Sequence, residues 1–267
     1  MNTLKEIVND HIAYRRQMVR LARADVKKAN GGLLGMGWAI LRPAIMIFVY
    51  WFTFTVGLRR GGDIEGYPFF LWLIAGIIPW YYMRDMISGG AGSIRRYSYL
   101  VTKIKYPVST VPTFVSMGYL AVHGGLMVIV FALFMLFGYM PAIYWIQIPL
   151  YTLMMFLFFT SWGLFAGMLS AISRDFLNLV KSLVQALFWV SGILYDASTI
   201  EQEWIRNILL FNPVTIVING YRNALVYHRW FWEDPQQLLN YAIVYGIMLF
   251  LSIWVYRRLK KDIPDVL

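Results

Sequence analysis

Six apolar stretches, each long enough to cross a lipid bilayer, dominate this sequence. They lie near residues 37–58, 68–87, 112–137, 147–171, 178–195 and 238–256. A membrane-spanning helix needs about 20 apolar residues, because the hydrocarbon core is about 30 Å thick and a helix rises about 1.5 Å per residue. Of all residues, 59% are hydrophobic and 14% are charged, whereas an average soluble domain is about 25% charged. The sequence therefore predicts an all-α integral membrane protein with six transmembrane helices.

The first 33 residues form an amphipathic segment ahead of this transmembrane domain, which we place at residues 34–267. Apolar residues recur every three or four positions between Leu4 and Val26, so they share one face of a helix. A second stripe carries the cations Arg16, Arg20, Arg23 and Lys27. Such a helix lies in the membrane interface with its cations at the lipid phosphates. The alternative is a soluble helix with a charged face, which the following apolar stretch disfavours.

Positive charge is concentrated on one side of the predicted membrane. Of the 24 Lys and Arg residues, 19 lie before residue 43, between residues 84 and 105, at Arg174 and Lys181, or in the carboxyl-terminal tail. Loops rich in Lys and Arg stay in the cytoplasm. Both termini, the 88–111 loop and the turn at 173–175 are therefore predicted to be cytoplasmic. This distribution among membrane loops argues against nucleic acid as a partner, although the net charge is +10.

Residues 204–227 are apolar enough to suggest a seventh crossing, but that crossing would carry the basic tail to the outer side. Asn212-Pro213 interrupts the stretch, and polar residues follow in its second half. We therefore predict two short re-entrant half-helices on the outer side, before the last span. Irregular backbone at membrane depth must be buried in protein or line a water-filled cavity. The outer-gate candidates are Asn212, Pro213, Tyr221 and Arg222. The alternative is a peripheral amphipathic helix on the outer surface.

Several kinds of chemistry find no support in the sequence. Cysteine is absent, and the histidines at residues 11, 123 and 228 belong to no metal-ligand pattern. No glycine-rich phosphate loop occurs, so ATP and its Mg²⁺ would bind to a partner chain. No carboxylate lies at the centre of a predicted span, which disfavours proton-driven transport. We expect a transport subunit that binds no cofactor itself. The alternative, a membrane-embedded glycosyl- or acyltransferase, lacks the carboxylate or histidine pairs it would need.

Five segments spread over the whole chain form a recognisable series. They are Leu34–Trp38 with Arg42-Pro43, Leu73–Trp80, Leu100–Pro107 with Val111-Pro112, Ser173–Asp175, and Phe211–Pro213 followed by Tyr221-Arg222. In this order they resemble the membrane subunits of ABC-2 type polysaccharide exporters. Within that family the resemblance is closest to the wall teichoic acid translocation permease of Gram-positive bacteria. It rests on Val49–Trp51, Gly57–Arg59, Ala224–Trp230 and Pro264–Leu267. Where the family often has Ser-Pro-Ile, this chain has Ser191-Gly192-Ile193.

The resemblance implies a homodimer that works with two copies of a cytoplasmic ABC ATPase in the plasma membrane of a Gram-positive bacterium. The implied cargo is wall teichoic acid linked to undecaprenyl diphosphate, moved from the cytoplasmic to the outer leaflet. The alternatives are an O-antigen or capsular polysaccharide, or small hydrophobic drugs or lipids. A polyanion would gather where cations concentrate. The candidates for binding the diphosphate are therefore Arg42, Arg84, Lys103 and Lys105.

The same resemblance assigns the first and fifth spans to the polymer path. Phe48, Trp51 and Phe52 would line one face of the first span, and Gln185, Phe188 and Tyr195 one face of the fifth. Aromatic planes and amides offer weak contacts along which a sugar polymer can slide. The alternative is that these aromatic side chains pack against lipid and neighbouring helices. Gln185 and Lys181 favour the path, because polar groups that face lipid are costly.

Coupling to ATP hydrolysis needs a cytoplasmic element that presses on the partner ATPase. The loop Ser93–Thr110 is basic, polar and placed between two predicted spans. Its coupling candidates are Arg95, Arg96, Tyr97 and Leu100. The alternative is a loop that lies on the lipid surface.

Overall fold

The structure is a computed structural model that describes residues 3–29, 37–57 and 62–267. Within these residues the regular structure is helical, apart from one antiparallel bridge between Ile64 and Tyr67. Residues 34–36 of the amino-terminal junction and residues 58–61 lie outside the described residues. The all-α class predicted from the sequence is therefore confirmed.

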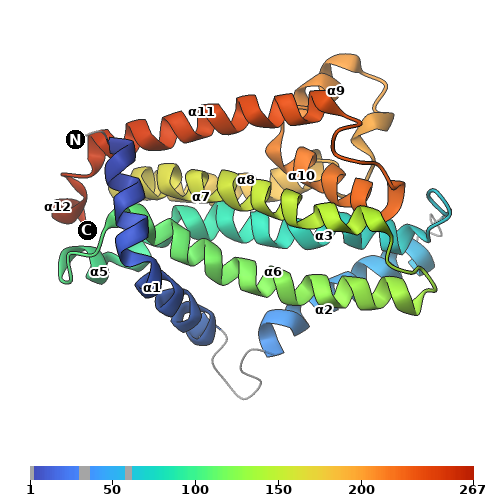
Figure 1. The fold of residues 1–267 in the computed structure, drawn as a ribbon, viewed down its shortest axis with the longest axis horizontal. Coiled ribbons are helices and arrows are strands. Elements are labelled where there is room, and N and C mark those ends of the chain that lie inside the picture. Colours follow the sequence, from blue (N-terminus) through green and yellow to red (C-terminus); the bar gives the residue numbers. More distant parts are fainter. Residues whose placement is uncertain (1–2, 30–36, 58–61) are drawn as a thin grey trace.

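Three long helices run along the length of the bundle (Figure 1). They are α6 (Val111–Leu136), α7 (Ile148–Ile172) and α11 (Pro235–Leu259). The 3₁₀ turns η3 (Val108–Thr110) and η4 (Ile143–Gln147) extend α6 and α7 at their starts. By length and composition these three helices could each cross a membrane.

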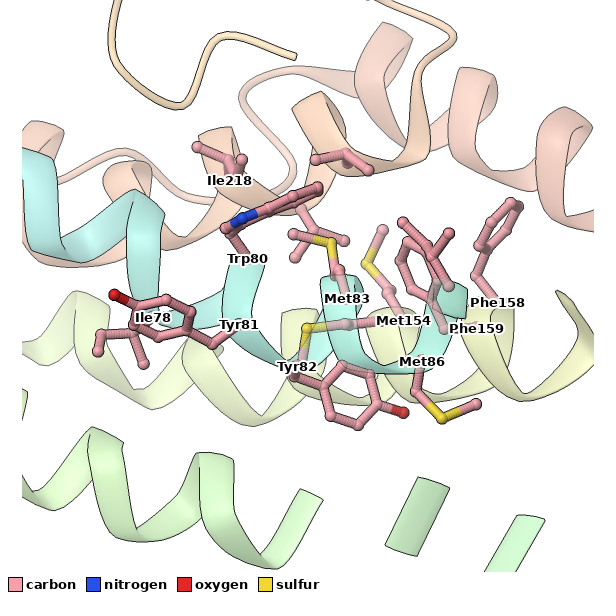
Figure 2. Close-up of a cluster of buried hydrophobic side chains, with 14 of the residues drawn as sticks. Ile78, Trp80, Tyr81, Tyr82, Met83, Met86, Met154, Phe158, Phe159 and Ile218 are labelled. Carbon is pink, nitrogen blue, oxygen red and sulfur yellow. The ribbon is translucent and has the colours of Figure 1, made fainter. Parts of the chain in front are cut away.

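The central helix is α3 (Phe69–Asp85), which continues as the π-helical η2 (Met86–Gly90). Every side chain from Leu71 to Met83 is buried. Figure 2 shows the later part of this run, from Ile78 to Met83, in one cluster with Phe158 and Phe159 of α7 and Ile218 of α10 (Pro213–Arg222). A helix that is apolar on all sides suits either lipid or a protein core. The structure places it in the core.

The remaining predicted spans also form helices, but shorter or more polar ones. α2 (Gly37–Trp51) continues as the π-helical η1 (Phe52–Gly57), and α8 (Arg174–Val190) occupies the place of the fifth span. This helix begins and ends earlier than the fifth span predicted near residues 178–195. The helix begins earlier because the Ser173 hydroxyl caps it, accepting from the Phe176 amide at 3.3 Å. It ends earlier because Gly192 adopts a left-handed φ of +69°. The count of six crossings stays a prediction.

Both chain termini lie at one end of the bundle, which we call the terminal end (Figure 1). The opposite end, which carries α9 (Glu203–Leu209), is the distal end. The predicted basic loop between the second and third spans also reaches the terminal end (Figure 1). The shorter elements are α4 (Ser93–Arg96), α5 (Ser98–Thr102), η5 (Ala197–Thr199), η6 (Asn223–Tyr227) and α12 (Ile263–Val266). Which end faces the cytoplasm stays a prediction.

The amphipathic helix α1 (Thr3–Ala29) packs across the start of α6 at the terminal end (Figure 1). His11 Nε2 lies 2.8 Å from the Thr113 hydroxyl, and the Ser109 hydroxyl donates to Asp10 at 2.7 Å. The expectation of one shared apolar face needs correction, because Met18 and Ala22 are buried against the protein whereas Leu4, Val8 and Ile12 are exposed. One face thus binds the bundle, and the other presents an apolar stripe beside the exposed cations Arg16, Arg20, Arg23 and Lys27.

The chain between residues 203 and 227 breaks at Asn212-Pro213, as predicted. The Asn212 side chain caps α10 by accepting from the Val214 amide at 2.9 Å, and Pro213 takes the first helical position. α10 packs against α3 and α7, and its residues Val214–Ile218 are buried. A peripheral surface helix therefore does not describe α10, whereas α9 ahead of the break is largely exposed. At Gly220 the backbone lies directly on the ring of Tyr151, because a Cβ there would overlap the ring atoms.

Candidate functional site

A polar cavity of about 280 Å³ opens between α1, α2, α3 and α6. Arg42 lies in its wall on α2, and Arg84 and Asp85 lie at the end of α3. Trp38 and Tyr81 add aromatic rings. The structure therefore brings together two of the four residues predicted to bind a diphosphate.

The two arginines of the polar cavity differ in whether a carboxylate pairs with them. Arg84 donates from Nε to Asp85 Oδ1 at 2.8 Å, and its guanidinium lies 5.1 Å from the ring centre of Tyr81. Arg42 lies 5.7 Å from the ring centre of Trp38, and no described carboxylate pairs with it. A guanidinium carries five N–H donors in a fixed fork that suits phosphate oxygens. The cavity can therefore bind an anionic headgroup.

Asp25 also lines the polar cavity, but other groups hold it. The Tyr97 hydroxyl donates to Asp25 Oδ1, and Arg96 lies 3.7 Å from Oδ2. Burial and the hydrogen bond to this carboxylate raise the pKa of Tyr97, so the phenol keeps its proton and donates it. Asp25 therefore does not neutralise Arg42.

Lys103 and Lys105 lie apart from the polar cavity. They belong to the exposed turn that follows α5, where Lys105 adopts a φ of +56°. Tyr99 of α5 and Ile104 of this turn have 66% and 55% of their surfaces exposed. We call residues 99–105 the basic tip. Tyr99 and Ile104 could not be singled out from the sequence, because the spacing of apolar residues does not show which side chains of a short loop are exposed.

The four coupling candidates mostly bond to, or pack against, other residues of the same chain. Arg95 donates to the Ser170 and Ala171 carbonyl oxygens at the end of α7. Arg96 and Tyr97 hold Asp25, and Leu100 is half-buried against the core. These contacts fix the loop to α7 and α1 and leave the basic tip as the surface that a partner can reach.

The predicted path residues do not share one surface. Phe48, Phe52 and Gln185 are exposed, but Phe188 is 7% exposed. Its ring lies 6.0 Å from that of Tyr50 and 5.8 Å from that of Trp80. Within one copy of the chain Phe188 is therefore covered and Gln185 exposed, and a polymer path along these residues stays a prediction. Tyr50 and Trp80, which bury Phe188, belong to other helices, so the spacing of residues along α8 could not predict these contacts.

A polar stripe runs along the exposed side of α8. Its members lie three or four residues apart, as expected for one face of a helix, and all are exposed. A polar surface is costly against lipid, so this face requires water or another chain. The stripe comprises Asn178, Lys181, Ser182 and Gln185.

The distal end holds a second polar cluster around Arg222 of α10. The guanidinium is 1% exposed and lies 3.4 Å from the ring centre of Trp72. It donates to the Gly192 carbonyl at 2.8 Å and to the Ile193 carbonyl at 2.6 Å. Arg222 thereby clamps the turn that ends α8 onto α3 and α10.

Trp72, Tyr227 and Asp196 complete this distal cluster. Trp72 Nε1 donates to the Tyr227 hydroxyl at 2.8 Å, and that hydroxyl donates to Asp196 Oδ2 at 2.9 Å. Burial would raise the pKa of Asp196, but hydrogen bonds from Ser198 and Tyr227 and the charge of Arg222 hold it below its usual value. The sequence pointed to Arg222 but not to these three residues, which come from distant segments.

The other gate candidates also contact the end of α8 or the core. Asn212 Nδ2 donates to the Ser191 hydroxyl at 2.9 Å. The Tyr221 hydroxyl lies 2.8 Å from His123 Nε2 and 2.5 Å from the Thr152 hydroxyl, which joins α10 to α6 and α7. Within the described residues, no three His, Cys, Asp or Glu side chains form a group that could hold a metal.

Comparison with known proteins gives one family match and relatives that share one name. The sequence pattern of the ABC-2 type transporters matches residues 16–226. An O-antigen export system permease protein RfbA from Myxococcus xanthus is 25% identical over 261 residues, which cover 97% of this chain and 98% of the relative. A protein of the same name from Klebsiella pneumoniae is 26% identical over 259 residues, 94% of each chain.

Proposed function

This chain belongs to the ABC-2 type transporter family, and from that premise we propose that it is the membrane subunit of an ATP-driven exporter of a lipid-linked polysaccharide. The observation that carries the proposal is the similarity to O-antigen export permeases along almost the whole chain. The same relatives favour an O-antigen-type polysaccharide over the wall teichoic acid expected from the sequence. The chain is a transport subunit rather than an enzyme.

The polar cavity supports this proposal at the start of transport. Its arginines, Arg42 and Arg84, are the groups that would receive the diphosphate of a lipid-linked glycan. In this proposal the terminal end faces the cytoplasm, because the basic residues concentrate there. The cargo therefore meets the cavity in the leaflet where it is made.

The polar stripe of α8 supports a path for the glycan. Hydroxyl and amide side chains can exchange hydrogen bonds with sugars without binding them tightly. We propose that the outward faces of α2 and α8 meet a second copy of the chain, so that the stripe of each copy faces a shared, hydrated path. The distal cluster then holds the outer end of each α8 in position.

The test is ATP turnover by the chain reconstituted with its partner ATPase. We expect lipid-linked O-polysaccharide to raise turnover several-fold, with smaller effects from a teichoic acid precursor and from membrane lipids. Stimulation by the teichoic acid precursor alone would contradict the cargo assignment. If none of the glycan lipids stimulates turnover, the export function itself fails.

A second prediction concerns the basic tip. Tyr99→Asp should lower the stimulated ATP turnover by about tenfold, because a charge placed in an apolar contact costs roughly 1.4 kcal/mol or more. Tyr99 is exposed, so the chain should still insert and melt normally. Leu100→Asp is a poorer test because Leu100 packs against the core.

The matched control is Met140→Asp, at an exposed residue of the loop between α6 and α7. It should leave both ATPase binding and turnover unchanged. Full stimulated turnover in the Tyr99→Asp variant would show that the basic tip does not couple the two subunits.

A further inference from the structure

The crevice between α2 and α6 contains two adjoining cavities of opposite character. The first is the polar cavity with Arg42 and Arg84. The second is an apolar groove of about 360 Å³. Its lining includes Ala44, Phe48 and Trp51 of α2 and Ile129, Leu133 and Phe137 of α6.

The two cavities follow one another along the same pair of helices. Pro43 lines the polar cavity and the next residue, Ala44, lines the apolar groove. On α6, Leu126 lines the first and Ile129 the second. From Arg42 to Trp51 the helix rises about 14 Å, at about 1.5 Å per residue. The crevice therefore leads from the two arginines into apolar surroundings.

We infer that this crevice binds the polyprenyl diphosphate anchor of the cargo, with the diphosphate at Arg42 and Arg84 and the hydrocarbon chain in the apolar groove. The inference rests on the proposed function. Arg42 has no described anionic partner, so it can take the first phosphate without breaking an ion pair. Arg84 has donors beyond those used by Asp85, and the second phosphate would compete with that carboxylate.

The shape of the crevice favours a single-chain lipid. The groove is lined mainly by α2 and α6, with Phe70 of α3, and offers one apolar track, which suits one isoprenoid chain better than the two acyl chains of a phospholipid. A diphosphate also matches two guanidinium groups, whereas most phospholipids present one phosphate.

This assignment separates the two parts of the cargo. Phe48 and Trp51 lie on the side of α2 that faces α6, whereas Tyr50 lies on the side that contacts Phe188 of α8. The lipid would thus travel along one side of α2 while the glycan follows the polar stripe of α8. The exposed aromatic residues of α2 serve the lipid rather than the sugar.

The test is binding of undecaprenyl diphosphate to the full chain in complex with its ATPase, measured by native mass spectrometry in detergent. Arg42→Gln with Arg84→Gln should weaken binding by about tenfold or more, since charge-assisted hydrogen bonds are lost. Ala44→Trp with Leu133→Trp should weaken it similarly by filling the groove. The control Val128→Trp, at an exposed residue of α6 outside the groove, should leave the affinity for undecaprenyl diphosphate unchanged.

Phosphatidylglycerol should compete poorly with undecaprenyl diphosphate for binding to the unaltered chain.

A second experiment uses smaller substitutions, so that a misfolded variant is not mistaken for a loss of lipid binding. The chain has no cysteine, so Leu133→Cys and Val128→Cys each give one attachment site for a photoreactive benzophenone. Undecaprenyl diphosphate should crosslink to the probe at residue 133 and not at residue 128.

The outcomes separate this inference from the proposed function. If groove filling leaves affinity unchanged and both cysteine positions crosslink equally, the crevice is not the lipid site, while export can still be measured through ATP turnover. If phosphatidylglycerol competes equally, the crevice holds bulk lipid and the inference fails. If the anchor binds in the crevice but no glycan lipid stimulates ATP turnover, the proposed function fails and the lipid site stands.

Discussion

Gly220→Ala is expected to lower the melting temperature of the detergent-solubilised chain by roughly 10 °C, since overpacking of this kind costs about 3 kcal/mol and each kcal/mol shifts melting by about 2–4 °C. The added methyl group would overlap the Cγ, Cδ1 and Cε1 atoms of Tyr151. That ring is fully buried, so neighbouring side chains leave it no room to turn away. α10 must therefore move away from α7. Intrinsic fluorescence of the 11 Trp residues reports the melting.

Gly246→Ala is the matched control for this prediction. It places the same methyl group in α11, where nothing lies within 4 Å of the new atom. Alanine is favoured over glycine in a helix by about 0.5–1 kcal/mol, so melting should stay equal or rise slightly. Adding Tyr151→Leu to Gly220→Ala should restore part of the loss. Equal melting of the Gly220→Ala variant and the unaltered chain would contradict the close packing of α10 on α7.

Arg222→Met is the second change with a large expected effect. It leaves the Gly192 and Ile193 carbonyl oxygens without their donor and removes the cation from the face of Trp72. Buried groups without partners cost about 1–3 kcal/mol each, so we expect a loss of about 3 kcal/mol overall. The melting temperature should fall by roughly 6–12 °C. Arg222→Lys should be intermediate, because lysine keeps the charge without the planar fork.

Hydrogen exchange separates a local clamp from general instability in the Arg222→Met variant. The clamp holds the turn at residues 192–196, so exchange in this segment should accelerate far more than in α11. Arg229→Met is the control, because Arg229 is exposed and lies 5.7 Å from the ring centre of Tyr227. If exchange rises evenly over the whole chain, Arg222 stabilises the bundle without positioning the end of α8.

Some residues of the candidate site could be predicted from the sequence, but their neighbours on other helices could not. Arg42 and Arg84 were both predicted from charge and position, but their shared cavity requires α2 and α3 to lie side by side. Phe188 was assigned to a polymer path from the family resemblance and from its spacing along the helix. Its burial depends on Tyr50 and Trp80, which lie on other helices. Spacing defines a face of a helix and not what covers it.

The sequence by itself determined the helical class, the apolar stretches and the break at Asn212-Pro213. These features depend on local physics: burial of apolar side chains, the missing amide of proline and capping by short polar side chains. Only the tertiary structure decided that α3 is the core, that α1 binds the bundle with one face, and that Arg222 is buried. Arg222 is buried because Trp72 and the carbonyl groups at residues 192 and 193, distant in sequence, supply its partners. Lipid and protein interiors are equally apolar, so hydropathy cannot distinguish them; packing between distant segments does.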